Sequence, residues 1–397
     1  MNKKVSVLEG SMAVAEAVRA CKTDVIAAYP ISPQTHIVED LSSFAADGRL
    51  NGKYICADSE FSAASAVYGA SAAGARAYTA SSSQGLLLMT EVVYNIAGMR
   101  LPVVFSGVNR TVSPPISINN DHQDTMTFRD CGIIQIHAES IQEAYDLHIQ
   151  AFKIAEDHRI LLPVMICMDG WTLTHSFTPV TTFSDEDVQE FIGGSIKPLQ
   201  CLNPKDEAPI SYGVGTDTLL LEYKYQMFEA MKNAETVIEE VANEYKEKFG
   251  FYNGGLVDAY KTEDADVILV AMGSVVSSAR VAIDELRVDG HKVGLLKIRS
   301  YRPFPSEEIV KYCKNARVLA LIDKAVTIGI GGVVSPELKA AFANMEGVPL
   351  IKDYIASGGK YLDVATIKDI FLDAEQVTKD NIKGQEFHFV KLLTEYL

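Results

Sequence analysis

Short apolar runs alternate with amphipathic stretches up to about residue 170. The apolar runs are rich in β-branched residues and have the length of buried strands, whereas the stretches between them carry apolar residues at helical spacing. We interpret as strands the runs TDVIAAYP, KYICAD, RAYTAS, LPVVFSGV, GIIQIHA and LLPVMICMD. Because strand and helix alternate, the pattern predicts an α/β fold in which a parallel sheet is covered by helices on both faces.

Two helices near the start carry boundary signals. The spacing predicts a first helix from Gly10 to about Lys22, for which Ser11 is the expected N-cap. A second helix is expected from Gln34 to Asp47, because Gly48 is well suited to end it.

The pattern changes after Trp171. Residues 178–215 show little periodicity and are interpreted as a long surface connection. Residues 222–250 form an amphipathic pattern without a sustained heptad, which indicates a helix packed against the first unit rather than a coiled-coil arm. A second α/β pattern begins at Asp266. We therefore predict a first domain at 1–177, a connection with a packing helix at 178–256, and a second domain at 257–397.

Composition narrows the class of protein. A chain of 397 residues with nearly half of them hydrophobic is globular, and its formal charge of −16 argues against a nucleic-acid partner. The six cysteines form no CxxC pair, which excludes a zinc ribbon or ferredoxin-type cluster within the chain. Most lie in apolar segments, such as Cys56 and Cys167, where buried reduced thiols are expected. No secretory segment or membrane-length apolar run is present, so we expect a cytoplasmic protein without a membrane partner.

The segment 107–126 is the strongest candidate for a functional loop. It follows an apolar strand and contains Pro114-Pro115 and a polar cluster, features of a loop at the carboxyl edge of a parallel sheet. Arg110 lies where the strand ends. Its planar guanidinium suits a carboxylate or phosphate, but an arginine that only pins the loop to a neighbouring acid explains the position equally well.

Four long segments together resemble one known family. They are YPISPQT at 29–35, DSEFSAASAVYGASAAGARAYTASSSQG at 58–85, NRTVSPPISINNDHQD at 109–124 and YRPFP at 301–305. They resemble the alpha subunit of pyruvate:ferredoxin oxidoreductase and, more broadly, the 2-oxoacid:ferredoxin oxidoreductases. The resemblance spans almost the whole chain. It implies a parallel-sheet pyrimidine-binding domain for thiamine diphosphate, followed by a smaller transketolase C-terminal-like α/β domain.

The resemblance also assigns residues to the cofactor. Glu60 matches the family's glutamate at the strand–helix corner, which would share a proton with N1′ of the aminopyrimidine. Such a carboxyl must be buried enough for its pKa to rise. Without the resemblance, Glu60 is explained as an acid favoured at a helix N-terminus. Tyr29 and Pro30 complete the expected cofactor-binding set.

A second group of residues would bind the substrate. Arg110 matches the family's arginine for the substrate carboxylate, and Ser32 matches a threonine that would contact the same carboxylate. Ile118 would form an apolar wall near the substrate's methyl group. Phe61 stands where the family often has histidine, and Asn119 stands where it often has tryptophan. A polar Asn119 disfavours bulky hydrophobic substrates and leaves pyruvate, 2-oxobutyrate or a small polar 2-oxoacid.

The motifs that are absent imply partner subunits. The chain has no GDG motif for a diphosphate and its Mg²⁺, and no cysteine cluster for electron transfer. The resemblance therefore implies a beta-like subunit that supplies the Mg²⁺–diphosphate site and a [4Fe-4S] cluster. It also implies a ferredoxin-like delta subunit and a gamma subunit, CoA as co-substrate, and ferredoxin as electron acceptor. No metal site is expected in this chain.

The expected function is that of the alpha subunit of a CoA-dependent 2-oxoacid:ferredoxin oxidoreductase. With pyruvate as substrate, the complex would form acetyl-CoA and CO₂ and pass electrons to ferredoxin, or run the reverse carboxylation. Three alternatives remain: a subunit for another small 2-oxoacid (2-oxobutyrate, 2-oxoglutarate or oxalate), a non-catalytic scaffold of the same complex, and a thiamine-dependent transketolase or decarboxylase fragment. Against oxalate, position 32 is a serine and no second arginine is found to meet a second carboxylate.

Overall fold

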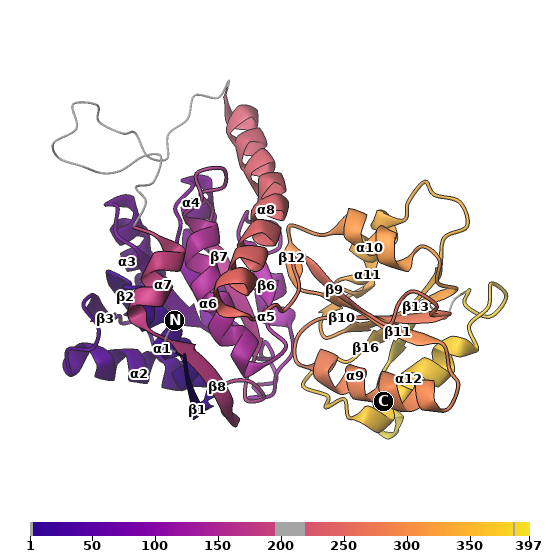
Figure 1. Ribbon diagram of the computed structural model, residues 1–397. Coiled ribbons are helices and arrows are strands. Elements are labelled where there is room, and N and C mark those ends of the chain that lie inside the picture. The colour runs from indigo at the N-terminus through magenta and orange to yellow at the C-terminus, as the bar shows by residue number, and fades with distance from the viewer. Residues whose placement is uncertain (1–2, 195–218, 384–385) are drawn as a thin grey trace.

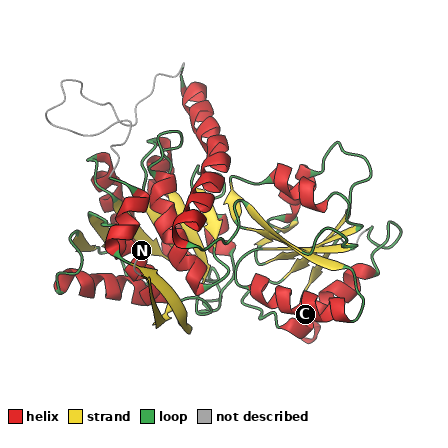
Figure 2. Ribbon diagram, viewed as in Figure 1, coloured by secondary structure: helices red, strands yellow, loops and turns green. Residues whose placement is uncertain are grey.

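The computed structural model describes residues 3–194, 219–383 and 386–397 and shows two α/β units side by side (Figure 1). Each unit has a mostly parallel sheet with helices on both faces (Figure 2). The α/β fold predicted from the alternating pattern is confirmed.

The N-terminal unit follows the predicted apolar runs. Its strands are β2 (Val25–Ala28), β3 (Lys53–Cys56), β4 (Ala77–Ser81), β5 (Val104–Asn109), β6 (Ile134–His137) and β7 (Val164–Asp169). Its main helices are α1 (Gly10–Ala20), α2 (Thr35–Ala46), α3 (Glu60–Ala72), α4 (Ser83–Gly98) and α6 (Ile141–Ala155), and a short helix, α5, spans Gln123–Met126. All six strands pair in parallel. Helices α1, α2 and α6 share one apolar cluster with the sheet, and α3 and α4 share another.

The C-terminal unit has a six-stranded sheet in the order β17-β16-β13-β10-β11-β9, in which only β9 is antiparallel to its neighbour. The strands are β9 (Val257–Tyr260), β10 (Val267–Ala271), β11 (Val293–Ile298), β13 (Val318–Asp323), β16 (Leu350–Ile355) and β17 (Phe387–Phe389). The helices are α9 (Val275–Val288), α10 (Ser306–Cys313), α11 (Ser335–Ala341) and α12 (Val364–Glu375). The short elements are β14 (Val326–Thr327), β15 (Gly331–Gly332) and a 3₁₀ turn at Thr394–Tyr396.

The first helix begins differently from the prediction. Strand β1 (Lys3–Glu9) runs directly into α1, so Glu9 occupies the N-cap position and makes no side-chain cap. Ser11 is not the N-cap, because it lies inside the helix and its hydroxyl donates to the carbonyl oxygen of Thr174. The prediction for Ser11 is wrong.

The connection between the two units contains regular structure that the sequence reading missed. Strand β8 (Phe177–Phe183) pairs antiparallel with β1, and helix α7 (Asp185–Ile192) follows it. Ser184 caps α7 by accepting from the backbone N–H of Asp187. The prediction of an irregular connection from residue 178 is therefore wrong up to residue 192, and residues 195–218 lie outside the described part of the chain.

The long helix α8 (Leu220–Phe249) lies along the N-terminal unit, as expected (Figure 1). Its buried side chains belong to the same apolar cluster as those of α1 and α6. Gly250 ends the helix with a φ of +82°, a conformation in which a side chain would be strained. Helix α8 thus packs as a spacer, and none of the described helices is long and apolar enough to cross a lipid bilayer.

One strand of the later sequence belongs to the earlier sheet. Strand β12 (Ser300–Arg302) pairs antiparallel with β6 and completes the seven-stranded order β12-β6-β7-β5-β4-β2-β3. The division at 1–177, 178–256 and 257–397 stays a prediction, and β12 crosses it.

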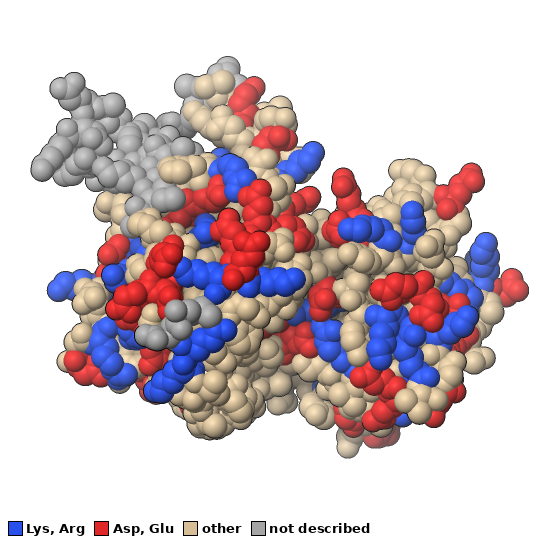
Figure 3. Space-filling model, in the orientation of Figure 1, with Lys and Arg blue, Asp and Glu red and all other residues tan. Residues whose placement is uncertain are grey.

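Buried ion pairs also join the two units. Lys324 Nζ lies 3.0 Å from Asp169 Oδ2, and Glu143 contacts both Lys297 and Arg299, at 2.7 and 3.2 Å. Burial alone would raise the pKa of Asp169, but the charges of Lys324 and His122 hold it well below its usual range. These contacts fix the edge of the first sheet against the C-terminal unit. Elsewhere, acidic and basic side chains are interspersed over the face in Figure 3.

The described cysteines are all free thiols. Cys21, Cys131, Cys167 and Cys313 are buried, as expected for most of them. Cys56 is exposed because it ends strand β3 at the sheet edge, so the expectation of burial is wrong there. Cys201 lies outside the described residues.

Candidate active site

Glu60 is the first residue of α3, directly after the corner that follows β3. Ser59 caps this helix by accepting a hydrogen bond from the backbone N–H of Ser62 at 3.2 Å. The Glu60 side chain is only 7% exposed. Among the described residues none donates a hydrogen bond to its carboxylate, and its place in the first turn of α3 also fits an acid favoured by the helix dipole.

Gly85 allows the backbone of α4 to lie close to this carboxylate. Gly85 lies in the first turn of α4, and a Cβ built on it would lie 2.5 Å from Glu60 Oε1 and 2.4 Å from Ser81 Oγ. No real Cβ fits at such distances. The backbone of α4 therefore approaches Glu60 closely, and the residue at 85 must be glycine for the carboxylate to keep this position.

Arg110 follows the last residue of β5 and is 7% exposed. Its Nη1 donates to the backbone oxygen of Ser32 at 2.7 Å, and its Nη2 donates to Gln84 Oε1 at 3.3 Å. Its buried Nε has no hydrogen-bond partner. Burial lowers the pKa of Arg110, and the charges of Asp124 and Glu60 oppose that effect.

Neither nearby aspartate binds this guanidinium. Asp124 instead accepts from the backbone N–H of Arg110 at 2.9 Å, and Asp121 accepts from Ser357 and from the backbone N–H of Gly358. The guanidinium of Arg110 therefore contacts only neutral oxygens and retains a buried donor. This is the donor set that an incoming carboxylate requires.

Asp124 organises the surroundings of Arg110. It is fully buried and accepts from the backbone N–H groups of Ser83, Arg110 and Thr125, and from the side-chain amide of Asn109, at 2.8–2.9 Å. Burial raises the pKa of Asp124 to about 7, although these hydrogen bonds act in the opposite direction. One carboxyl group thus ties the end of β5 to the start of α4.

The loop at 29–34 is held by one buried glutamine. The Nε2 of Gln34 donates to the carbonyl oxygen of Ala80 at 2.7 Å and to that of Tyr29 at 3.3 Å. Tyr29, Pro30 and Ser32 are exposed. The structure thus brings the backbone of Ser32 to Arg110. It leaves Tyr29 and Pro30, which were predicted to contact the cofactor, exposed.

Ile118 and Asn119 lie in the loop after Arg110. Ile118 is 54% exposed. The backbone oxygen of Asn119 accepts from Thr111, while its side chain abuts Gly359 of the C-terminal unit. Asn119 lines a cavity of about 250 Å³ between the two units, together with residues such as Trp171 and Lys324. The structure does not bring the Asn119 side chain into contact with Arg110.

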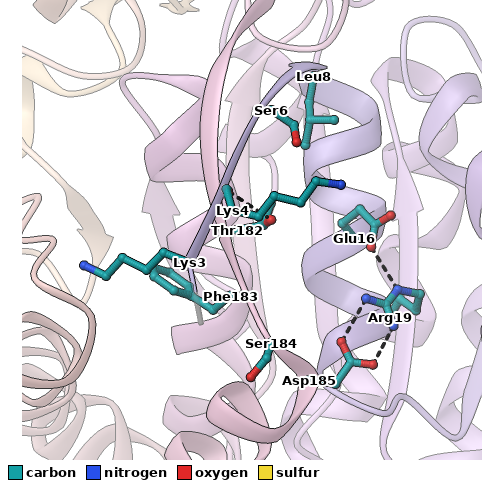
Figure 4. A pocket seen from close by; sticks show the side chains of 10 residues that line it. All are labelled: Lys3, Lys4, Ser6, Leu8, Glu16, Arg19, Thr182, Phe183, Ser184 and Asp185. Atoms are coloured by element: carbon teal, nitrogen blue, oxygen red, sulfur yellow. Dashed lines mark hydrogen bonds and ion pairs between the residues drawn. The ribbon is translucent and has the colours of Figure 1, made fainter. Parts of the chain in front are cut away.

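A separate groove of about 440 Å³ lies between β1, β8, α1 and α7 (Figure 4). Arg19 binds Asp185 and Glu16 there, so its charge is already neutralised. None of the predicted site residues lines this groove, and it does not contribute to the site.

The sequence reading missed four residues that shape the site. Gln34, Gln84, Gly85 and Asp124 position Glu60, Arg110 or the loops beside them. Gln34, Gln84 and Gly85 lie inside the YPISPQT and SSSQG segments. The resemblance to a family identified these segments but did not indicate what the three residues do. Asp124 lies inside the 109–124 segment, but the motif alone does not indicate that it binds the backbone of Arg110.

The arrangement fits a cofactor and a carboxylate substrate. Glu60 is a buried acid that forms no ion pair with any described residue, Gly85 lets the backbone of α4 pack closely against it, and the buried Nε of Arg110 has no hydrogen-bond partner. Several large apolar side chains of β3, α3 and α4 are exposed at the surface. They are Ile55, Phe61, Leu87 and Leu88.

The chain is similar in sequence to known families and proteins. The family described as pyruvate flavodoxin/ferredoxin oxidoreductase, thiamine diphosphate-binding, matches residues 16–243, and core domain II of pyruvate:ferredoxin oxidoreductase matches residues 265–367. The chain is 44% identical to pyruvate synthase subunit PorA of Methanosarcina barkeri, over 100% of this chain and 98% of the relative. It is 37% identical to ketoisovalerate oxidoreductase subunit VorA of Pyrococcus horikoshii, over 97% and 98% of the two chains.

Solved structures agree on the fold. A 2-oxoglutarate:ferredoxin oxidoreductase from Magnetococcus marinus matches with a TM-score of 0.72 and 18% identity over 94% of this chain, which spans 65% of that longer one. A split-gene transketolase matches with a TM-score of 0.55 and 12% identity, over 93% of this chain and 98% of the other. Such identities show the fold alone. The sequence matches go further and extend over nearly the whole chain, which therefore belongs to the pyruvate:ferredoxin oxidoreductase family.

Proposed function

We propose that the chain is the alpha subunit of a CoA-dependent pyruvate:ferredoxin oxidoreductase complex. The complex converts pyruvate to acetyl-CoA and CO₂ with electrons passed to ferredoxin, or runs the reverse carboxylation. The observation that carries this proposal is the pair of buried charged groups, Glu60 and Arg110, neither of which has an ion-pair partner among the described residues. The full-length similarity to subunits named pyruvate synthase supports it.

Thiamine diphosphate is the cofactor that fits the site. Tyr29, Pro30 and Glu60 would hold its pyrimidine, and Gly85 lets the backbone of α4 pack closely against the Glu60 carboxylate, which fixes its position. When bound, the cofactor supplies the nucleophilic carbon and the electron sink that decarboxylation of a 2-oxoacid needs. The Glu60 carboxyl would share a proton with a ring nitrogen of the bound cofactor.

Arg110 and Ser32 orient the substrate. The guanidinium of Arg110 would donate two parallel hydrogen bonds to the substrate carboxylate. The Ser32 side chain, in the exposed loop that Gln34 supports, adds a hydroxyl donor to the same carboxylate. Fixing this group before CO₂ leaves places the 2-oxo carbon where the reaction occurs.

Partner subunits complete the site. We assign the diphosphate, its Mg²⁺ and a [4Fe-4S] cluster to a beta-like subunit, further clusters to a ferredoxin-like delta subunit, and place a gamma subunit beside them. The exposed apolar side chains of β3, α3 and α4 support a protein partner at this surface. CoA accepts the acyl group and ferredoxin the electrons, and we place the complex in the cytoplasm.

Pyruvate is the substrate that the relatives favour most. The relative named for ketoisovalerate shows that the wider family also includes enzymes for larger 2-oxoacids. Ile118, expected to form a pocket wall, is exposed, and Asn119 faces the C-terminal unit. Neither residue therefore narrows the choice of 2-oxoacid further. A subunit for 2-oxobutyrate or another small 2-oxoacid is the second candidate.

Replacing Glu60 by glutamine in the assembled complex tests the proposal. The amide keeps the shape of the side chain but cannot exchange a proton with the cofactor ring, so the rate of the chemical step should fall about a hundredfold or more. Circular dichroism should show an unchanged fold. Single-turnover rates within a few-fold of wild type would mean that Glu60 is only an acid at the start of a helix.

A further inference from the structure

Three side chains of the metal-binding types meet in a part of the N-terminal unit that the proposed reaction does not use. Glu9 ends β1, His36 lies in the first turn of α2, and His175 lies in the turn between β7 and β8. One ligand atom from each of them lies within 4.8 Å of the other two. All three side chains are half-buried, so they are supported by the fold and still reached by solvent.

The hydrogen bonds around His175 leave one ring nitrogen free. Thr174 Oγ1 lies 2.6 Å from His175 Nδ1 and also accepts from the backbone N–H of Trp171 at 3.0 Å. A hydroxyl oxygen has two lone pairs and can accept both N–H groups. In the tautomer whose Nδ1–H donates to this hydroxyl, His175 Nε2 keeps its lone pair, which is the arrangement that metal-ligating histidines usually show.

The turn that carries His175 is fixed against the segment that carries Glu9. The backbone N–H of Gly10 donates to the carbonyl oxygen of Ser176 at 3.1 Å, and that of Ser11 donates to Thr174 at 3.0 Å. A Cβ on Gly10 would lie 1.6 Å from the carbonyl oxygen of Leu173, so only glycine allows this approach. Two of the three ligands are therefore in place before any ion arrives, which reduces the entropy cost of binding.

Charge and chemistry favour a cation at this position. Glu9 Oε1 lies 2.8 Å from His36 Nδ1, and Glu39 and Asp40 add negative charge around His36. Two imidazoles and a carboxylate are a common ligand set for Zn²⁺, with bond lengths of about 2.0–2.2 Å that place tetrahedral ligands about 3.3 Å apart. The side chain of His36 is 45% exposed, so its rotation can close the remaining gap without moving the backbone.

We propose that Glu9, His36 and His175 form a binding site for one divalent transition-metal ion of the Zn²⁺ class. The ion takes the place of the proton between Glu9 and His36, and His175 provides the third ligand. Water fills the remaining coordination position. A bound ion joins the start of α1, the first turn of α2 and the turn after β7.

Calorimetry and fluorescence on the full-length chain, without a polyhistidine tag, test this proposal. ZnCl₂ is titrated in the calorimeter, and NiCl₂ is titrated while the emission of Trp171 is followed. Trp171 is the only tryptophan in the sequence, and its ring centroid lies 4.1 Å from that of His175, so bound Ni²⁺ should quench it. We expect one ion per chain, with quenching complete at one equivalent.

Substitutions then decide whether these ligands hold the ion. His36→Gln and His175→Gln should each weaken Zn²⁺ binding by about tenfold or more. His36→Gln is the safer variant, because His36 lies on the surface of α2 and its loss should leave the fold intact by circular dichroism. His291→Gln is the matched control: His291 forms the same kind of pair with Glu375, at 2.8 Å, but no third ligand among the described residues joins it.

The outcomes are clear-cut. Loss of binding in both site variants, with His291→Gln unchanged, supports the site. The proposal is overturned if no binding saturates at one equivalent, in which case Glu9 and His36 form only an ion pair. It is equally overturned if binding survives both site substitutions, because the ion then binds elsewhere, for example at the exposed thiol of Cys56.

Discussion

Glu60 and Arg110 are each 7% exposed, yet neither forms an ion pair with any described residue. Burying a charged group without a partner is expensive, so a fold rarely retains one unless a ligand or a reaction needs it. The surrounding residues hold the pair in place without neutralising it. Gly85 has no side chain that would displace the Glu60 carboxylate, and Asp124 binds the backbone rather than the side chain of Arg110.

Gly85→Ala tests whether the close approach of α4 to the Glu60 carboxylate matters for activity. The new methyl group would meet Glu60 Oε1 at 2.5 Å, so the carboxylate must move. A displacement of this kind should lower kcat about ten- to a hundredfold while the chain stays folded. Gly98→Ala, in the same helix, is the control, because its Cβ meets nothing within 4 Å. Equal activity in the two variants would show that Glu60 has no required position.

The sequence motifs predict Glu60 and Arg110 as site residues, but they do not predict which residues hold these two side chains in place. Glu60 and Arg110 were found because their segments resemble a family, and both were given a plain structural alternative. The roles of Gly85 and Asp124 could not be read in the same way. Asp124 accepts from residues at positions 83 and 110, and such a convergence exists only after the chain has folded.

At the scale of elements, buried strands were the most predictable part of the fold. The central strands of both units are continuous apolar runs because both of their faces are covered by helices. Strands β1 and β8 form a half-exposed pair outside these sheets, and β12 has three residues, so none of them produces such a run. Ser11 was mistaken for a cap because a serine at the start of a helical pattern gives the same signal whether or not a strand precedes it.

Helix α8 depends on polar contacts as well as apolar ones. The hydroxyl of Tyr245, which is fully buried, donates to Asp146 Oδ1 at 2.8 Å, and Asn253 donates to the other oxygen at 3.0 Å. Burial raises the pKa of Asp146 to about 7, while these hydrogen bonds act to lower it. One carboxyl group thus links α6, α8 and the segment after α8.

Tyr245→Phe should therefore destabilise the chain. Removing the hydroxyl leaves a buried carboxyl oxygen with one donor fewer, which costs about 1–3 kcal/mol in the free energy of unfolding. Urea unfolding measures the change. Tyr223→Phe on the same helix should have no effect, because Tyr223 is 49% exposed and no described residue bonds to its hydroxyl. If both variants are as stable as wild type, α8 is held by apolar packing alone.

At the scale of the whole molecule, the two units are joined by buried charge and a shared strand. Lys324 of the C-terminal unit neutralises Asp169 at the end of β7, and β12 extends the N-terminal sheet. The depressed pKa of Asp169 means that this carboxylate contributes stability above about pH 4 and loses it as the pH falls through the depressed value.

Lys324→Met should show this dependence directly. At pH 7 the variant leaves Asp169 charged, buried and without its cation, which costs about 3–5 kcal/mol. The cost should shrink at pH 5, because the carboxyl group can then take up a proton. Lys339→Met serves as the control, since its pair with Glu386 is exposed and should contribute under about 1 kcal/mol. A cost that does not change with pH would contradict the assignment.

The assembled complex is the setting in which the central claim can be tested most directly. The claim is that Arg110 binds the carboxylate of a 2-oxoacid beside a cofactor that Glu60 serves. The decisive measurement is kcat/KM for pyruvate in the Arg110→Lys complex, taken together with thiamine diphosphate affinity and melting temperature. Lysine keeps the charge but cannot donate two parallel hydrogen bonds.

A charge-assisted hydrogen bond contributes about 1.5–3 kcal/mol. We therefore expect kcat/KM to fall about tenfold to a hundredfold, with cofactor affinity and melting temperature unchanged. A complex with normal kcat/KM would contradict the account. So would a loss of cofactor affinity and thermal stability in parallel, because Arg110 would then act only by bracing its loop.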